Sequence, residues 1–376
     1  MMKVSCSQED LSKGLAVVGR AVATRAVLPI TNNVLIATEG SQLKLAATNL
    51  EIAITCWIGA TIEEEGTITI PARLVTDFVN SLPSGRIDMI LSPRSQSLEL
   101  RCARYEAHVS GLDPADFPPI PKIAEGVTVK VKAEELRMAI NQVVFAAASE
   151  ESRPVLTGVH AEFDGDQLTL AAADGFRLAV RKLSLDTPVD EKISVIIPAR
   201  SLAELNRLIT DQQEPVELTI NPKKSQTIFR LRNAEMVSQL IQGTFPNYEQ
   251  LIPQAYSTRA VVKLSEFLMA TRSASIFARD GSGIVRLQIM PKDGKGKIAI
   301  SARAEEVGDN LGEVDAVVEG EEAKVAFNSK YLMDVLGVLT EEEVALEATT
   351  SSSPGVIRPV GKDNYIHVVM PMFVQW

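Results

Sequence analysis

Ile197-Pro-Ala-Arg-Ser-Leu-Ala-Glu-Leu-Asn-Arg-Leu-Ile209 is the stretch that decides the fold of this 376-residue chain, because it occurs three times in related form. Ile70-Pro-Ala-Arg-Leu-Val-Thr-Asp-Phe78 precedes it, and Phe327-Asn-Ser-Lys-Tyr-Leu-Met-Asp-Val-Leu336 follows it. Each copy comes after a β-rich run. A proline at the start of the first two copies predicts a short amphipathic helix, and Asn328 is a suitable N-cap for the third.

The spacing of the three copies gives the domain organisation. Superposition places Arg73, Arg200 and Lys330 at one position, and the separations are 127 residues (200 − 73) and 130 residues (330 − 200). A period of this size indicates repeated domains, because solenoid repeats are only about 20 to 50 residues long. We expect domain I over residues 1–122, domain II over 127–253 and domain III over 258–376.

Each predicted domain has one order of elements: a helix, strands, the short helix of the repeated stretch, and further strands. In domain I, Ser7 can cap the first helix. Strands with period-two alternation follow, such as Gln42-Leu-Lys-Leu-Ala-Ala-Thr48. The sequence therefore predicts an α+β fold of three tandem domains, each with two helices packed on antiparallel sheets.

Composition limits the possible functions. The net charge of −10 argues against a generally basic nucleic-acid binder, so any contact with DNA must come from locally segregated charge. The three cysteines are far apart in the sequence, and we expect them to be buried apolar side chains. No apolar run approaches the length of a membrane span and no signal-peptide pattern is present at the N-terminus, so a cytoplasmic location is expected.

Basic residues recur on the predicted helices, away from the apolar faces. Lys13 and Arg20, Arg200 and Arg207, and Arg272 and Arg279 are each seven residues apart, a spacing that returns to nearly the same side of a helix. One interpretation is that these helix faces are ordinary solvated surfaces. On them the cations of the repeated stretch would pair with the acid four residues later, as in Arg73–Asp77, Arg200–Glu204 and Lys330–Asp334. That basic-to-acidic order is the less favourable one for a helix, so we favour a shared anionic partner.

Such cations neutralise phosphates without reading bases, and the binding would be independent of sequence and sensitive to salt. The sequence has no aromatic residues beside these cations, which disfavours stacking on single strands. We therefore expect duplex DNA.

Residue patterns typical of catalysis are missing. His108, His160 and His367 lie in different predicted domains and have no partner at metal-ligand spacing, so we expect strand histidines and no metal. The chain contains no G-x-x-x-x-G-K-[S/T] motif, and Asp174-Gly175 is typical of a turn. We predict a protein that is not an enzyme and needs no cofactor.

With its tripled unit, Ile197-Pro-Ala-Arg200, Ala173-Asp-Gly-Phe-Arg-Leu-Ala-Val180, Thr244-Phe-Pro-Asn-Tyr248 and Val369-Met-Pro-Met372, the chain resembles the β sliding clamp family of bacterial replicative DNA polymerases over its full length. The resemblance implies a head-to-tail homodimer whose six domains close a ring around duplex DNA. Such a ring slides without chemistry and tethers the replicative polymerase, which makes synthesis processive. The clamp loader and other proteins with clamp-binding motifs would be further partners.

The resemblance and the helix charges together give candidate residues of three kinds. The DNA-facing candidates are Lys13, Arg20, Arg25, Arg73, Arg137, Arg153, Arg200, Arg207, Arg272, Arg279 and Lys330. The resemblance implies a partner-peptide pocket of Leu156, Ala173, Gly175, Phe176, Arg177, Leu178, Pro246, Leu251, Asn328, Tyr331, Val368, Met370, Pro371 and Met372. Ala107 and Val109 in domain I are expected to meet Ile276 and Phe277 of a second copy.

Several residues depart from the family pattern. Glu150, Pro154 and Val155 surround Arg153, and Phe176 and Phe373 stand where the family commonly has His and a basic residue. An alternative function is a three-domain adaptor that binds peptides without enclosing DNA. An enzyme is the third hypothesis, and it would need an activity that depends on a carboxylate such as Asp174.

Overall fold

The computed structural model describes residues 2–23, 28–92, 96–150, 152–210, 212–279, 283–292, 295–304, 306 and 308–376, without the side chains of Arg279 and Lys295. The chain divides into two compact units. Unit 1 consists of Met1–Glu134 and Glu204–Leu240, and unit 2 of Glu135–Ala203 and Ile241–Trp376. Each unit is described by itself.

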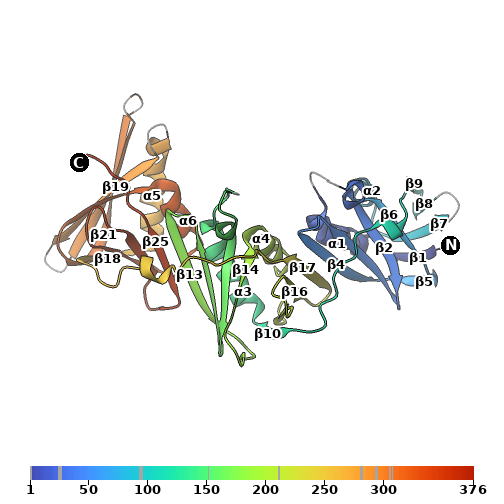
Figure 1. Cartoon of the computed structure of the whole chain (residues 1–376). Helices are drawn as coiled ribbons and strands as arrows, with labels where there is room; N and C mark the ends of the chain where they lie inside the picture. The colour runs from blue at the N-terminus through green and yellow to red at the C-terminus, as the bar shows by residue number, and fades with distance from the viewer. Residues whose placement is uncertain are drawn as a thin grey trace. The chain divides into compact units, whose positions relative to one another are not determined.

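One order of elements occurs three times along the chain (Figure 1). The first copy comprises β1 (Met2–Ser7), α1 (Gln8–Val18), β2 (Asn33–Glu39), β3 (Gln42–Thr48), β4 (Ile52–Gly59), β5 (Thr61–Glu64), β6 (Thr67–Pro71), α2 (Ala72–Ser81), β7 (Arg86–Ser92), β8 (Ser97–Cys102) and β9 (Tyr105–Ser110). The second comprises β10 (Val127–Val131), α3 (Ala133–Val143), β11 (Gly158–Asp164), β12 (Gln167–Ala173), β13 (Arg177–Ser184), β14 (Ile193–Pro198), α4 (Ala199–Leu208), β15 (Val216–Ile220), β16 (Gln226–Arg230) and β17 (Ala234–Gln239).

The third copy comprises β18 (Thr258–Lys263), α5 (Leu264–Arg279), β19 (Ile284–Lys292), β20 (Lys295–Ala304), β21 (Gly308–Gly320), β22 (Ala323–Asn328), α6 (Ser329–Val338), β23 (Glu343–Ala348), β24 (Gly355–Pro359) and β25 (Tyr365–Val369). In it, the single long strand β21 takes the place of β4 and β5. The predicted fold class of three tandem α+β copies is confirmed.

The strands form three antiparallel sheets. Unit 1 has a five-stranded sheet in the order β5-β1-β7-β8-β9 and an eight-stranded sheet in the order β10-β15-β16-β17-β4-β3-β2-β6. Unit 2 has a twelve-stranded sheet in the order β14-β11-β12-β13-β25-β24-β23-β18-β21-β20-β19-β22. The larger sheets therefore join strands of consecutive copies.

Local chemistry places the helices where the sequence predicts them. The Ser7 hydroxyl accepts a hydrogen bond from the Asp10 amide at 3.0 Å and caps α1. Asn328 Oδ1 accepts from the Lys330 amide at 2.9 Å and caps α6, whereas Pro71 precedes the first residue of α2. Leu11, Leu15 and Val18 of α1 are buried, and α1 packs against β4 and α2 (Figure 1).

Consecutive copies are joined by the same kind of strand pair in both units. In unit 1, Ala234 to Ser238 of β17 pair antiparallel with Cys56 to Ile52 of β4. In unit 2, Tyr365 to Val369 of β25 pair with Arg181 to Arg177 of β13. In both cases the first residue of the later strand lies opposite the fifth residue of the earlier strand.

Two strands, β9 and the first half of β21, have a hydrogen-bonded neighbour on one side only. β9 ends its sheet, so Tyr105 to Val109 pair only with β8. The first five residues of β21, Gly308 to Gly312, pair only with β20, because β18 pairs with the other end of β21 from Ala316 to Gly320. Within the residues that the structure describes, neither edge has a second strand beside it.

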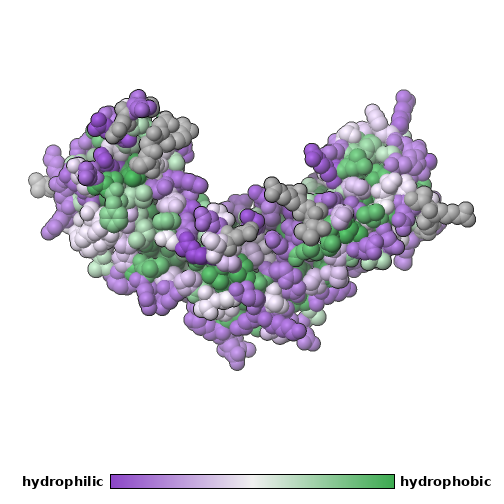
Figure 2. All heavy atoms as spheres, turned by 45° about the horizontal axis from the view of Figure 1, so that its top comes forward, coloured by the Kyte–Doolittle hydropathy of each residue, from purple (hydrophilic) through white to green (hydrophobic). Residues whose placement is uncertain are grey.

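In the described part of the chain, no helix is long and apolar enough to cross a membrane. The three cysteines are free and buried, as expected from their scattered positions. On the face drawn in Figure 2, hydrophilic residues cover most of the surface and apolar residues show in smaller patches between them.

Candidate nucleic-acid and peptide interfaces

A cation stands at the second residue of each short helix. Arg73 is second in α2, Arg200 second in α4 and Lys330 second in α6, and all three side chains are exposed. The N-terminus of a helix carries a partial positive charge, so a cation there is unfavourable for the helix itself. Free amide groups of a first turn and a basic side chain together make a good site for an anion, but at α6 the amides of Ser329 and Lys330 already donate to the Gly283 carbonyl and to Asn328 Oδ1.

Two of the three acidic residues four positions later form ion pairs with other cations. Only Arg73 reaches its acid, with 3.9 Å between Arg73 Nε and Asp77 Oδ2. Glu204 pairs with Arg207 at 2.5 Å and with Arg20 at 3.5 Å, and Asp334 pairs with Arg177 at 2.6 Å. The interpretation as ordinary i,i+4 pairs is therefore wrong for α4 and α6, because other partners take both carboxylates.

Four of the predicted DNA-facing cations that lie on α-helices have no carboxylate within ion-pair distance among the described residues. They are exposed and lie on four different helices of unit 2: Arg137 on α3, Arg200 on α4, Arg272 on α5 and Lys330 on α6. An exposed cation without a protein partner is available to a phosphate. Such a contact would release counterions from the DNA, which makes the binding sensitive to salt.

Unit 1 brings three of the predicted cations around one groove. Lys13, Arg20 and Arg207 line a depression of about 570 Å³ whose wall also includes Trp57 and Arg232. Arg20 lies in the 3₁₀ helix Gly19–Ala21 beyond the end of α1, so its expected place on the same α-helix as Lys13 is wrong. Lys13 pairs with Glu9 at 2.6 Å, so these cations are partly neutralised within the chain.

The remaining predicted DNA-facing residues are Arg25, Arg153 and Arg279. Arg25 and the side chain of Arg279 lie outside the described residues. Arg153 is exposed, and its guanidinium lies against Gly175, where a Cβ carbon on the glycine would be only 3.2 Å from Arg153 Nη1. Gly175 has φ of +94°, which a residue with a side chain rarely adopts, so the turn at Asp174-Gly175 requires glycine here.

Seven of the predicted peptide-pocket residues line one cavity of about 400 Å³ in unit 2. They are Ala173, Gly175, Arg177, Leu178, Leu251, Val368 and Met370, and the cavity is completed by Gln250, Ile252, Pro253 and Pro354. Leu251 and Met370 remain 55% and 42% exposed at its rim. An apolar cavity with flexible methionine at its edge suits short apolar peptides of varied sequence.

The floor of the cavity is a buried apolar cluster. Leu156, Leu178, Phe245, Tyr248 and Val368 belong to it, and it joins β12, β13 and β25 to the segment after β17. Leu156 therefore supports the cavity from beneath. The close packing of this floor fixes the shape that an incoming side chain meets.

Arg177 holds the rim of the cavity by its guanidinium. Its side chain is 7% exposed and donates to Asp174 at 3.0 Å, to Asp334 at 2.6 Å and to the Phe145 carbonyl at 2.6 Å. Its guanidinium carbon also lies 4.4 Å from the centre of the Tyr331 ring. The charge is fully used inside the protein, so Arg177 positions α6 and the turn before β13.

Other predicted pocket residues do not line this cavity. Phe176 is exposed on the turn, Pro246 is exposed, Pro371 is buried, and Asn328 and Tyr331 belong to the start of α6. Met372 donates its amide to the Ala326 carbonyl at 2.8 Å, which directs the chain end along β22. Sequence reasoning missed Pro354, since nothing in the sequence places the turn before β24 beside Leu251.

Two of the predicted dimer residues lie on the open strand β9, and the other two lie on α5, where Phe277 is beside the open end of β21. Ala107 is half-buried on β9, and Val109 is 3% exposed, so its side chain already packs inside unit 1. Ile276 is exposed on α5, and a Cβ on Gly308 would be 3.9 Å from the Phe277 ring. Tyr105, 56% exposed at the start of β9, is an apolar edge residue that sequence reasoning missed.

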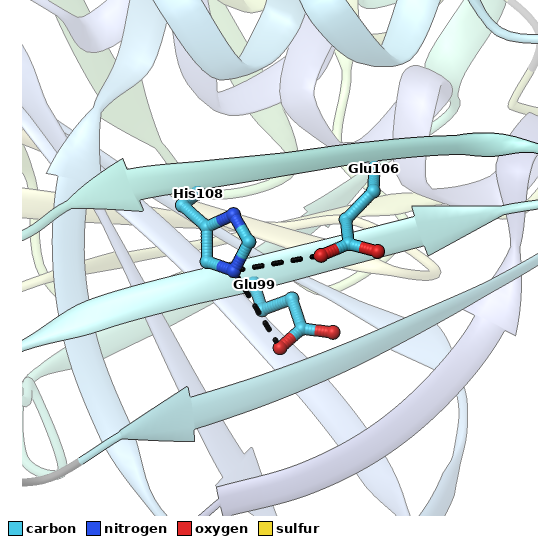
Figure 3. Close-up of side chains that lie close together, drawn as sticks. All are labelled: Glu99, Glu106 and His108. Atoms are coloured by element: carbon cyan, nitrogen blue, oxygen red, sulfur yellow. Dashed lines mark ion pairs between the residues drawn. The ribbon is translucent and has the colours of Figure 1, made fainter.

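The outer face of β8 and β9 gathers charged groups (Figure 3). His108 Nε2 lies 3.7 Å from Glu99 Oε2 and 3.6 Å from Glu106 Oε1, because the strand register places Glu99 opposite His108. Arg101 pairs with both carboxylates, with Glu106 at 3.3 Å. The single guanidinium offsets one of the two negative charges of this cluster.

The fold and these surfaces define a class of protein: three repeated α+β domains with exposed cations on short helices, and an apolar peptide-sized cavity in the second unit. Sequence models described as the N-terminal, central and C-terminal domains of the DNA polymerase III beta subunit match residues 2–121, 130–247 and 249–373. The chain belongs to the DNA polymerase III beta subunit family, which confirms the resemblance.

Relatives match along the whole length. The beta sliding clamp of Bacillus subtilis (strain 168) is 31% identical over 381 residues, with 99% of each chain covered. That of Staphylococcus aureus (strain Mu50) is 32% identical over 362 residues, with 94% of each chain covered. The solved DNA polymerase sliding clamp of Bacillus subtilis has a TM-score of 0.94 at 30% identity over 100% of both chains. The DNA polymerase III subunit beta of Pseudomonas aeruginosa has 0.92 at 30% identity, covering 99% of this chain and 100% of that one.

Proposed function

We propose that this protein is a DNA sliding clamp. Two copies close head to tail into a ring around duplex DNA, and the ring tethers the replicative polymerase so that synthesis is processive. It performs no chemistry and needs no cofactor. Its place of action is the cytoplasm, where bacterial DNA is copied.

The observation that carries this proposal is the pair of open strand edges. The first five residues of β4 and β13 are each covered by the last strand of the next copy, β17 and β25. The corresponding five residues of β21 have no such cover within the described chain, and β9, the last strand of the first copy, has an open edge. A second chain can supply each missing strand, and this heterologous contact closes when two chains exchange it.

The register of the existing pairs predicts the register of this ring seam. The first residue of β9 should lie opposite the fifth residue of β21, which pairs Tyr105 with Gly312, Ala107 with Asn310 and Val109 with Gly308 of the partner subunit. Tyr105 would then cover a glycine, an arrangement that restores apolar contact at a strand edge. Phe277 beside Gly308 would face Val109, which agrees with the dimer residues predicted from the sequence.

The DNA contact is assigned to the exposed helix cations. Arg137, Arg200, Arg272 and Lys330 have no carboxylate partner in the described chain, and Arg200 stands at the N-terminus of α4, where the helix dipole adds to the attraction for phosphate. None of these contacts would read bases, so sliding meets no preferred sequence. Enclosure, rather than affinity, would keep the ring on the duplex.

Retention on circular duplex tests the proposal. Clamps loaded on a nicked circle by a clamp loader should remain through gel filtration at about 0.5 M salt and leave within minutes after a single cut, because only a free end releases a ring. Equal loss from circular and cut DNA would instead favour the peptide-binding adaptor, which encloses nothing.

The cavity of unit 2 is proposed as the site where the polymerase and the clamp loader insert short apolar peptides. Replacing Leu251 and Met370 at its rim by Asp should weaken peptide binding at least about a hundredfold, since each change places a charge against apolar surface. Isothermal calorimetry with a clamp-binding peptide would measure the loss. Phe373→Asp is the control, because Phe373 is exposed outside the cavity, and similar weakening by it would contradict the assignment.

A further inference from the structure

The ring seam proposed above puts a histidine between two acids. The predicted register pairs Glu106 with Leu311 and His108 with Asp309 of the partner subunit. Odd-numbered residues of β21 lie on the face away from α5, since a Cβ on Gly312 would be 3.6 Å from the Ala270 Cβ. Glu106 and His108 are exposed on the outer face of β9, so the two charged faces would meet on one side of the joined sheet (Figure 3).

The acids at this seam outnumber the cations next to them. On one side of the seam, Arg101 is shared by Glu99 and Glu106, so the addition of Asp309 of the partner subunit leaves three carboxylates with one guanidinium, an excess of two negative charges. On the other side, Arg303 lies opposite Asp309 in the register of β20 and β21 but is one strand further from β9. Leu311 is 67% exposed and brings no charge.

We infer that protonation of His108 strengthens ring closure, with the imidazolium held between Glu99 of its own chain and Asp309 of the partner subunit. Directly opposite residues of antiparallel strands have Cβ atoms about 4.5 to 5.5 Å apart, close enough for this pair. This inference rests on the head-to-tail closure proposed above and names a condition that regulates it.

The residues that would lie opposite each other across the seam differ in polarity from those across the two strand pairs inside the chain. Across β4 and β17 the opposed residues include Ile54 with Met236 and Ala53 with Val237, which are apolar. Across β13 and β25, Leu178 lies opposite Val368. These opposed pairs are apolar, although Glu235 also lies opposite Thr55, whereas the seam would set His108 opposite Asp309 of the partner subunit.

His108 differs from the other two histidines in its exposure. His160 and His367 lie in strands of unit 2, and burial lowers the pKa of both, that of His367 to about 3 with a contribution from the Arg177 charge. Burial therefore favours the neutral form of both. His108, in contrast, is exposed and lies beside the carboxylates of Glu99 and Glu106.

Sedimentation equilibrium of the full-length protein at pH 6 and pH 8, at constant ionic strength, tests the inference. The dimer dissociation constant should be about tenfold lower at pH 6, about threefold for each of the two seams. The variants His108→Gln and Asp309→Asn should each keep the dimer but remove most of this difference. Glu306→Gln changes an exposed acid near the same strand and should leave the difference intact.

The outcomes separate this inference from the function on which it rests. A chain that stays monomeric at both pH values contradicts the ring itself. A dimer whose dissociation constant is the same at both pH values, or whose pH response survives in His108→Gln, overturns only the role of His108. Tightening by zinc chloride that EDTA reverses, without a pH response, would also overturn it and assign the cluster to a metal.

Discussion

Changing Arg137, Arg200, Arg272 and Lys330 together to Glu is expected to lower the affinity for linear duplex DNA at about 50 mM salt at least about a hundredfold. Each lost phosphate contact should also flatten the dependence of log K on log salt by about one unit. Filter binding or fluorescence anisotropy over a salt series measures both quantities. Folding should be little affected, because the four side chains are exposed and leave no buried acid without its partner.

Two of the four changes should even favour their helices. Arg200 and Lys330 are second in α4 and α6, where a carboxylate is preferred to a cation. Thermal unfolding of the single variants Arg200→Glu and Lys330→Glu should therefore show an unchanged or slightly raised midpoint. If reversing the charge of a side chain removes DNA binding but leaves thermal stability unchanged, that side chain acts in DNA binding and not in folding.

The control has the same change in net charge on other elements. Lys122, Lys182, Lys223 and Lys292 are exposed and lie on strands, turns and a connecting segment. Their replacement by Glu should weaken binding far less, through the general loss of positive charge alone. Equal weakening by both quadruple variants would show that net charge, not the helix positions, governs the contact with DNA.

The sequence predicted those features that depend on neighbours along the chain. The repeated stretch predicts the starts of α2, α4 and α6, and capping chemistry is local, so Ser7 and Asn328 act as expected. Asp174-Gly175 forms the expected turn because this turn requires a positive φ at position 175, which glycine adopts readily. Period-two alternation in the same way predicts strands such as β3, which spans the residues expected for it.

What the sequence could not predict depends on pairing between distant segments. Asp334 binds Arg177, which is 157 residues away, instead of Lys330 on its own helix. The register of β8 and β9 sets Glu99 opposite His108, a cluster that spacing along the chain does not reveal. The open edges of β9 and β21 are likewise visible only when all strand partners are known.

The replacement of Tyr105 by Ser together with Ile276 by Asp is expected to convert the dimer into monomers at micromolar concentration. Both side chains are exposed and apolar: Tyr105 is on the open strand β9, and Ile276 on α5 precedes Phe277, which lies beside Gly308. Aromatic anchors such as Tyr105 often dominate interface energies. Because the ring has two seams, the binding free energy lost at one seam is lost again at the other. The dimer dissociation constant should therefore rise at least about a thousandfold. Mass photometry or sedimentation equilibrium measures it.

This variant also distinguishes the ring from the adaptor. The cavity lined by Leu178, Leu251 and Met370 lies within unit 2 and contains neither changed residue, so peptide affinity should be unaltered. A monomer that binds peptide normally yet leaves circular DNA as fast as linear DNA would show that enclosure depends on the seam. Val317→Asp with Tyr256→Ser is the matched control, since Val317 lies where β21 already pairs with β18. Monomers formed by the control pair alone would place the seam elsewhere on the chain.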